Sequence, residues 1–105
     1  MAKQVILTDI AERDLEHITD YLIENWGAVV CGKFLHRFEQ VCEIISDNPS
    51  IYPIVYNKEK IRKCVLTHQN TIYFREHTHK IELLTIFDNR QDPSKLAALI
   101  GNSEA

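Results

Sequence analysis

The sequence predicts an α+β domain with the element order β-α-α-β-β-β, in which a helical hairpin packs on a small, mostly antiparallel sheet and a short C-terminal helix follows. Two observations predict it. Apolar residues recur at helical spacing in two long stretches of the N-terminal half, and three short strand-like stretches with hairpin-sized turns come after them. The chain has 105 residues, 45% of them apolar, which suffices for one compact core. We therefore expect a single domain over residues 1–105.

The first helix is expected to follow a short strand at residues 4–7. Asp9, with Glu12 three residues later, resembles a capping box and places acids where the helix dipole favours them. Steps of four, three and four residues then place one apolar stripe on the helix, formed by Ala11, Leu15, Ile18 and Leu22. Gly27 can adopt the left-handed conformation that ends a helix.

A second helix is predicted from about residue 28 to residue 46, because its apolar residues keep helical spacing throughout. Pro49 ends it, since the residue before a proline disfavours helix. Only a few residues join the two helices, so they should form an antiparallel hairpin. Residues 48–60 are expected to form a loop, because Pro49 and Pro53 break strands, and this loop should be fixed to the core by Tyr52, Ile54 and Tyr56.

Three strands are predicted at about residues 61–66, 71–76 and 80–87, and Pro93 begins the final short helix. Strict alternation in the last strand would place Ile81, Leu83, Thr85 and Phe87 on one face. The opposite face would then carry Glu82, Leu84 and Ile86, and it too is largely apolar. Either the C-terminal helix or another chain should cover this second face.

The distribution of charge separates the two halves of the chain. The net charge is −3, which argues against a generic nucleic-acid binder. Residues 9–47 carry nine acids and three bases, whereas the segment from residue 48 onward carries eight bases and six acids. A phosphate-facing surface is therefore expected in the second half.

Several functional classes are excluded by the same reading. No apolar stretch is long enough for a membrane helix, and the N-terminal apolar stretch is too short for a secretory signal, so we expect a cytoplasmic protein without membrane association. Cys31, Cys42 and Cys64 are widely spaced, which is typical of reduced thiols in a core. The close pair His77 and His79 lacks further ligands at metal-binding spacing. We expect no metal and no cofactor.

Three segments together resemble a known family. They are TDIAERDLEHITDYLIENWG, FEQVCEIISDNPSIYP and IYFREHTHKIELLTIFDNRQDP, at residues 8–27, 38–53 and 72–93. Their order and spacing resemble the RelE/ParE superfamily of type II toxin–antitoxin toxins, which includes plasmid stabilisation proteins, over about residues 3–96. The resemblance implies the same β-α-α-β-β-β fold and no small-molecule substrate. It also implies a cognate antitoxin that wraps the toxin, which suits the second sheet face with Leu84 and Ile86.

The resemblance leaves two targets open. RelE-like members cut messenger RNA at the ribosome, whereas ParE-like members inhibit DNA gyrase by binding. RNA cleavage without a metal needs a proton acceptor, a proton donor and cations. His68 or Glu76 could be the base, with Arg62, Lys63 and Arg75 as cations. However, the sequence has no Tyr or His after residue 79, where nuclease members carry one, and Gln69-Asn70 stands where many have an Arg. This favours the ParE-like branch, with a decayed, non-toxic antitoxin-binding protein as a third possibility.

The candidate target-binding residues are Arg90 and the basic run Lys58, Lys60, Arg62 and Lys63. Each has a structural alternative. The run can be a solvated surface, His68 can be a turn residue, and Arg75 can pair with Glu82 across a hairpin. Arg90 can form a local ion pair with Asp88 or Asp92.

Overall fold

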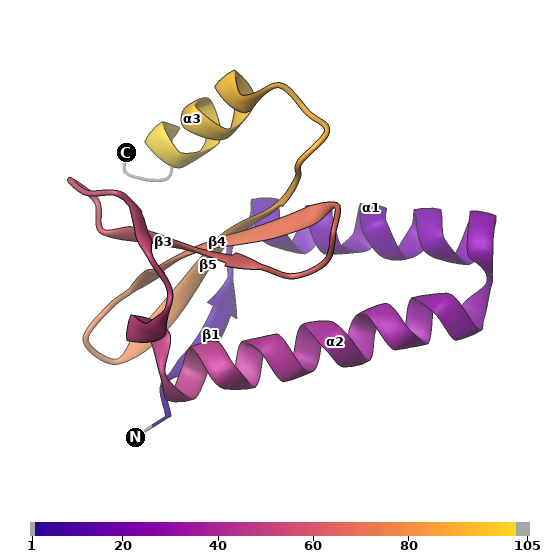
Figure 1. The fold of residues 1–105 in the computed structure, drawn as a ribbon, viewed down its shortest axis with the longest axis horizontal. Coiled ribbons are helices and arrows are strands. Elements are labelled where there is room, and N and C mark those ends of the chain that lie inside the picture. Colours follow the sequence, from indigo (N-terminus) through magenta and orange to yellow (C-terminus); the bar gives the residue numbers. More distant parts are fainter. Residues whose placement is uncertain (1, 103–105) are drawn as a thin grey trace.

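The computed structural model describes the backbone of residues 2–102 and the side chains of residues 2–100 (Figure 1). Its elements are β1 (Gln4–Leu7), α1 (Asp9–Trp26), α2 (Ala28–Asp47), the 3-10 helix η1 (Pro49–Ile51), β2 (Ile54–Tyr56), β3 (Ile61–Val65), β4 (Asn70–Glu76), β5 (Lys80–Asp88) and α3 (Pro93–Asn102). The sheet has the strand order β1-β5-β4-β3-β2, and only β1 and β5 are parallel neighbours. The predicted α+β class and the mostly antiparallel sheet are confirmed.

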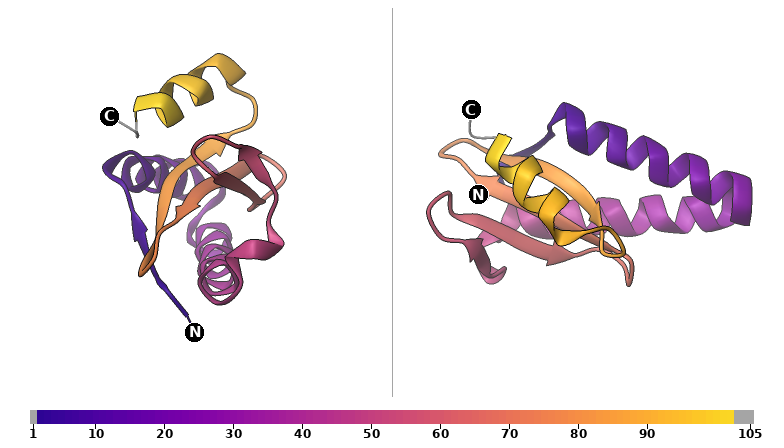
Figure 2. Two further views of the ribbon diagram at one scale, coloured as in Figure 1. Left: turned by 90° about the vertical axis from the view of Figure 1, so that its left-hand side faces the viewer. Right: turned by 90° about the horizontal axis from the view of Figure 1, so that it is seen from above.

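The sheet lies between two helical layers. The α1–α2 hairpin covers one face, and α3 lies over the other (Figure 2). Within the described residues, no helix is long and apolar enough to cross a membrane. Gly27 connects the two hairpin helices at a φ of +88°, in the region that favours glycine, but its ψ of 172° lies outside the predicted left-handed helical conformation.

The main core lies between the hairpin and the sheet, and it confirms the two predicted apolar helix faces. Leu15, Ile18 and Leu22 of the α1 stripe pack against it while remaining half-buried. Each large apolar side chain that is fully buried stabilises the fold by about 1.5–3 kcal/mol. The buried residues of this core are Ala11, Phe34, Phe38, Val41, Ile45, Cys64, Leu66, Ile72, Phe74, Ile81, Leu83 and Ile86.

The segment at residues 48–60 differs from the predicted loop. It contains η1 and a fifth strand, β2, which pairs antiparallel with β3. Pro53 does not prevent this strand, because it precedes β2 and β2 lies at the edge of the sheet, where a missing N–H is tolerated. Tyr52 packs edge-on against Phe74 with ring centroids 5.8 Å apart, but Ile54 is 40% exposed and does not fix the segment to the core.

Strand β5 departs from strict alternation. Phe74 of β4 pairs with Leu83 and the preceding Tyr73 pairs with Thr85, so Leu84 is an extra residue in β5. Such a β-bulge reverses which residues face each side beyond it. The predicted faces are therefore wrong for Ile86 and Phe87, whereas Leu84 lies on the face predicted for it. Ile86 joins the main core, whereas Leu84 and Phe87 share the opposite face.

Helix α1 holds β5 at this bulge. Thr8, rather than the predicted Asp9, is the N-cap of α1, because its Oγ1 accepts a hydrogen bond from the backbone N of Ala11 at 3.1 Å. The same hydroxyl donates to the carbonyl of Leu84 at 2.8 Å. Two turns into the helix, Asp14 Oδ2 accepts from Thr85 Oγ1 at 2.5 Å and from the backbone N of Ile86 at 3.0 Å.

The second apolar face of the sheet is covered by α3. Of the two predicted alternatives, the C-terminal helix and another chain, the structure shows the C-terminal helix. Leu84 and Phe87 of β5 contact the helix residues Leu96 and Ile100, and Ile61 of β3 completes this smaller core. Tyr56, Tyr73 and Leu99 pack around it. Leu84 is 4% exposed as a result.

We predict that Asp14→Ala destabilises the fold by about 1–3 kcal/mol, because Thr85 and the Ile86 amide would lose their buried acceptor. Asp14→Asn retains one acceptor oxygen and should cost less. Urea unfolding measures both variants. Asp20→Ala, an exposed acid on the same helix, is the matched control and should change the free energy of unfolding by no more than about 0.5 kcal/mol. Equal effects of Asp14→Ala and Asp20→Ala would contradict a stabilising role for the hydrogen bonds between Asp14 and β5.

Candidate functional site

A cleft of about 640 Å³ lies where the helical hairpin meets the β3–β4 turn and the end of β5. From α1 and α2 it is lined by Asp14, His17, Ile18, Tyr21, Leu22, Val30, Lys33, Phe34 and Arg37. The sheet side and α3 contribute Thr67, His68, Gln69, Asn70, Thr85, Ile86, Phe87, Asp88, Arg90, Gln91 and Leu99.

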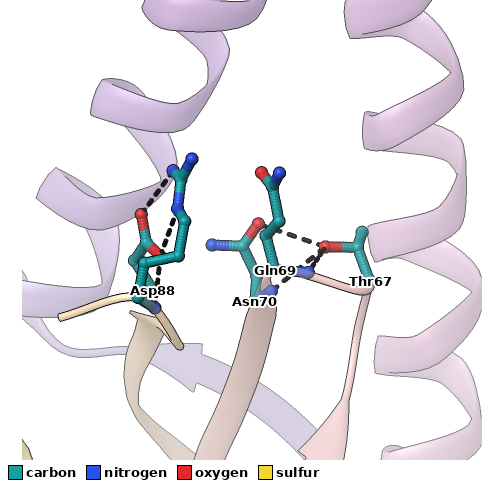
Figure 3. Close-up of polar contacts among 5 residues, drawn as sticks. Thr67, Gln69, Asn70 and Asp88 are labelled. Carbon is teal, nitrogen blue, oxygen red and sulfur yellow. Dashed lines mark hydrogen bonds and ion pairs between the residues drawn. The ribbon is translucent and has the colours of Figure 1, made fainter. Parts of the chain in front are cut away.

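The turn between β3 and β4 forms one wall of the cleft. Thr67 Oγ1 accepts hydrogen bonds from the backbone N of Gln69 at 3.3 Å and of Asn70 at 3.2 Å, which closes the turn tightly. The carbonyl of Gln69 accepts from the backbone N of Asn89 at 2.8 Å, so the turn is tied to the end of β5. Figure 3 shows the side chains of Gln69, Asn70 and Asp88 standing at neighbouring strand ends, between two helices.

Helix α2 contributes two cations to the lining of the cleft. Lys33 and Arg37 are four residues apart, which places them on the same side of the helix. Arg37 Nε donates to the carbonyl of Leu66 at 3.2 Å, and this bond holds the guanidinium beside the start of the β3–β4 turn. His17 and His68 are exposed at the cleft. Cationic groups therefore face the cleft although the chain as a whole is acidic.

The two carboxylates of the cleft are engaged in structural bonds. Asp14 holds the β5 bulge, and Asp88 holds Arg90. Asp88 Oδ1 accepts from the Arg90 backbone N at 2.9 Å and from Nε at 3.0 Å, while Oδ2 accepts from Nη2 at 2.7 Å. These bonds hold the pKa of Asp88 below its ordinary value of 3.8, with the side-chain bond from Arg90 as the main cause. The guanidinium is thus fixed in one direction although its side chain is 62% exposed.

Apolar side chains from the helices also line the cleft. Ile18, Leu22 and Phe34 form its floor between the helices, and the partly exposed Tyr21 and Val30 form its rim. A cleft with an apolar floor and cationic walls suits a polypeptide that offers apolar and acidic side chains. Because both carboxylates already accept structural hydrogen bonds, neither is placed as an open proton acceptor.

The structure brings three of the residues singled out from the sequence to the cleft, namely His68, Ile86 and Arg90. The basic run lies elsewhere: Lys58 and Lys60 occupy the β2–β3 turn, Lys63 is exposed on β3, and Arg62 Nη1 donates to the carbonyl of Tyr52 at 2.6 Å.

The other predicted residues have structural partners or are buried. Arg75 pairs with Glu82 across the β4–β5 hairpin at 3.3 Å, which is the alternative given for it above. Of the two residues assigned to antitoxin binding, Leu84 lies beneath α3 and Ile86 in the main core, 4% and 2% exposed. Contact of an antitoxin with either one stays a prediction, and it would require surrounding elements to move.

Several cleft residues were not identified from the sequence. Asp14, His17 and Tyr21 follow one another at three and four residues on α1, and Lys33 and Arg37 are four apart on α2. This helical spacing of polar residues is a signal that could have identified them. It is weak in isolation, because most charged residues at such spacing form solvated helix faces.

Comparisons with known proteins agree with the fold and its order of elements. The family of ParE toxins of the type II toxin–antitoxin system parDE matches residues 5–93. Eleven chains of solved structures match, among them one described as the chromosomal ParDE toxin–antitoxin system from P. aeruginosa. That chain is 17% identical, with a TM-score of 0.70, and the alignment covers 83% of the present chain and 96% of the other. No curated protein sequence matches.

We predict that the Asp88–Arg90 pair withstands mild acid. Because the folded-state pKa of Asp88 is lowered, the pairing is present above the ordinary value of 3.8 and is lost only as the pH falls through the lowered pKa. The Arg90 Nε–H resonance, followed by NMR during acid titration, should keep its paired chemical shift at pH 3.8 and change below it. A midpoint at or above that pH would contradict the geometry.

Proposed function

Since the chain belongs to the ParE toxin family of type II toxin–antitoxin systems, we propose that it inhibits DNA gyrase by binding and that a cognate antitoxin holds it inactive. The family match extends over most of the chain and agrees with the observed element order. The proposed site of action is the cytoplasm, where gyrase works. Plasmid stabilisation is the proposed cellular role.

The separation of the candidate nuclease residues carries the proposal. An RNA-cleaving site needs its base and cations around one phosphate. Here His68 lines the cleft, whereas Arg62 is directed to the Tyr52 carbonyl and Arg75 to Glu82. Dispersed groups of this kind cannot act on one scissile bond, so they favour binding over cleavage.

Arg90 is the proposed contact with the target. It follows β5 directly, it is exposed at the rim of the cleft, and Asp88 fixes the orientation of its planar fork. A pre-oriented guanidinium loses little conformational entropy when it meets a carboxylate or phosphate, which a lysine side chain cannot reproduce. Asp88 therefore acts as a positioning residue for Arg90.

One observation keeps the ribosome-dependent mRNA endonuclease as an alternative. His68 lines the same cleft as Arg37 and Lys33, so one candidate base and two cations do share a cavity. Messenger RNA and the ribosome would be the partners in that case. A decayed chain that only binds antitoxin would show neither activity.

Induction of the chain without antitoxin separates these functions. The gyrase proposal predicts filamentous cells and DNA damage while messenger RNA stays intact. Northern blots of abundant messages and a DNA-damage reporter measure the two effects in the same culture. Rapid ribosome-dependent cuts in messenger RNA would replace the proposal with the nuclease alternative, and normal growth at full expression would identify a decayed member.

Arg90→Ala should abolish most of the growth inhibition without lowering the thermal midpoint or preventing antitoxin pull-down, because the side chain is exposed. Asp88→Asn keeps the charge of Arg90 but weakens its orientation, so growth inhibition should fall by a smaller factor. Combining the two should add nothing to Arg90→Ala. Arg13→Ala, an exposed arginine of α1 outside the cleft, is the matched control. Full toxicity of Arg90→Ala would refute the assigned contact.

A further inference from the structure

The sheet has an open edge on the side of β2. The sheet order places β2 outermost, and this strand pairs only with Ile61 and Arg62 of β3. The backbone bond from Lys63 N to the Pro53 carbonyl, at 3.1 Å, continues the contact by one residue. Within residues 2–102, no strand pairs with the outer side of β3 at Val65, which pairs inward with Thr71 of β4. Strand-forming backbone groups therefore line an edge formed by β2 and the outer end of β3.

This edge is strongly basic. Residues 58–63 contain four bases and one acid, in a chain whose net charge is −3. Lys58, Lys60 and Lys63 are exposed, so their ammonium groups face solvent along the edge. Arg37, held at the Leu66 carbonyl, adds a cation at the end of β3. An acidic ligand lying along the edge would meet positive charge over its whole length.

Apolar side chains accompany these cations. Ile54 and Val55 of β2 are 40% and 39% exposed, and Val65 of β3 is 59% exposed. Proteins usually blunt an exposed edge with charge or proline and avoid apolar side chains there. The lysines alone would protect the edge from pairing. They do not explain why β-branched side chains are exposed on both strands of the edge. The combination is that of a surface that a partner covers.

We infer that this edge, defined by β2 and residues 63–65 of β3, binds an extended acidic segment of another polypeptide as an added strand. A polypeptide strand supplies all three kinds of contact at once: backbone hydrogen bonds, acidic side chains for the lysines and apolar side chains for the valines. A nucleic acid would neutralise the lysines but leave the open backbone and the valines without partners. The inference does not depend on gyrase as the target, because Arg90 takes no part in it and Arg37 is the cleft residue that borders the edge.

A designed peptide tests the edge with the whole chain. The probe is a short acetylated and amidated peptide in which glutamate alternates with valine and threonine. It should bind, with an affinity that falls as salt is raised, and it should slow amide hydrogen exchange at Val55 and Val65. Two control peptides separate the contributions. One replaces glutamate with lysine and should not bind, and the other carries N-methylated residues at alternate positions, which removes the donors of an added strand.

Charge reversal on the protein provides the second comparison. Lys60→Glu combined with Lys63→Glu should lower the affinity for the acidic peptide by at least about tenfold, since two attractive charge pairs become repulsive. Lys95→Glu combined with Lys80→Glu, two exposed lysines of α3 and β5 away from the edge, should leave its affinity unchanged.

Three results would overturn the inference. If the N-methylated peptide bound as tightly as the unmethylated acidic peptide, binding would rest on charge attraction without strand pairing. Duplex DNA or RNA that protects the edge amides while the acidic peptide does not would indicate a nucleic-acid surface. Sedimentation that shows self-association, with protection at the same amides, would indicate a second copy of the chain.

Discussion

The bulge in β5, held in place by α1, is the constraint on which the rest of this structure depends. Strand β5 lies between two other strands of the sheet. It pairs with the edge strand β1 on one side and with β4 on the other. A strand between two partners would ordinarily keep one register throughout. The extra residue Leu84 changes that register. Thr8 donates to the Leu84 carbonyl, Asp14 accepts from Thr85 and from the Ile86 amide, and these bonds hold the bulge in place.

The bulge connects the two cores to the cleft. It sends Leu84 and Phe87 to the face that α3 covers, and it returns Ile86 to the main core beneath the hairpin. Asp88 then emerges at the edge of the cleft, with Arg90 two residues later. A uniform strand would keep Leu84 on the α3 face but would exchange the other two residues, with Phe87 under the hairpin and Ile86 under α3. The position of Arg90 is therefore a consequence of local packing around Leu84.

Long, periodic segments were predictable from the sequence, because their apolar stripes are repeated over several turns. Both hairpin helices, the three later strands and the C-terminal helix were placed within a residue or two. The bulge was not predictable, since Leu84, Thr85 and Ile86 fit strict alternation equally well. The bulged arrangement is selected by the hydrogen bonds that Asp14 accepts from Thr85 and Ile86. The strand β2 was missed because Pro53 reads as a strand breaker, although an edge position tolerates it. The cleft was not predictable either, because it depends on how α1 and α2 pack against the strand ends, and the sequence of one segment does not determine that packing.

The central claim is that this toxin acts by occupying its target, and purified gyrase provides the most direct measurement. The chain, freshly released from its antitoxin, is added to a gyrase supercoiling reaction on relaxed plasmid, and the supercoiled product is measured against toxin concentration. We expect supercoiling to fall in a dose-dependent manner, and we expect added antitoxin to restore it. Unchanged supercoiling at saturating toxin, with cleavage of messenger RNA on purified ribosomes by the same preparation, would contradict the account.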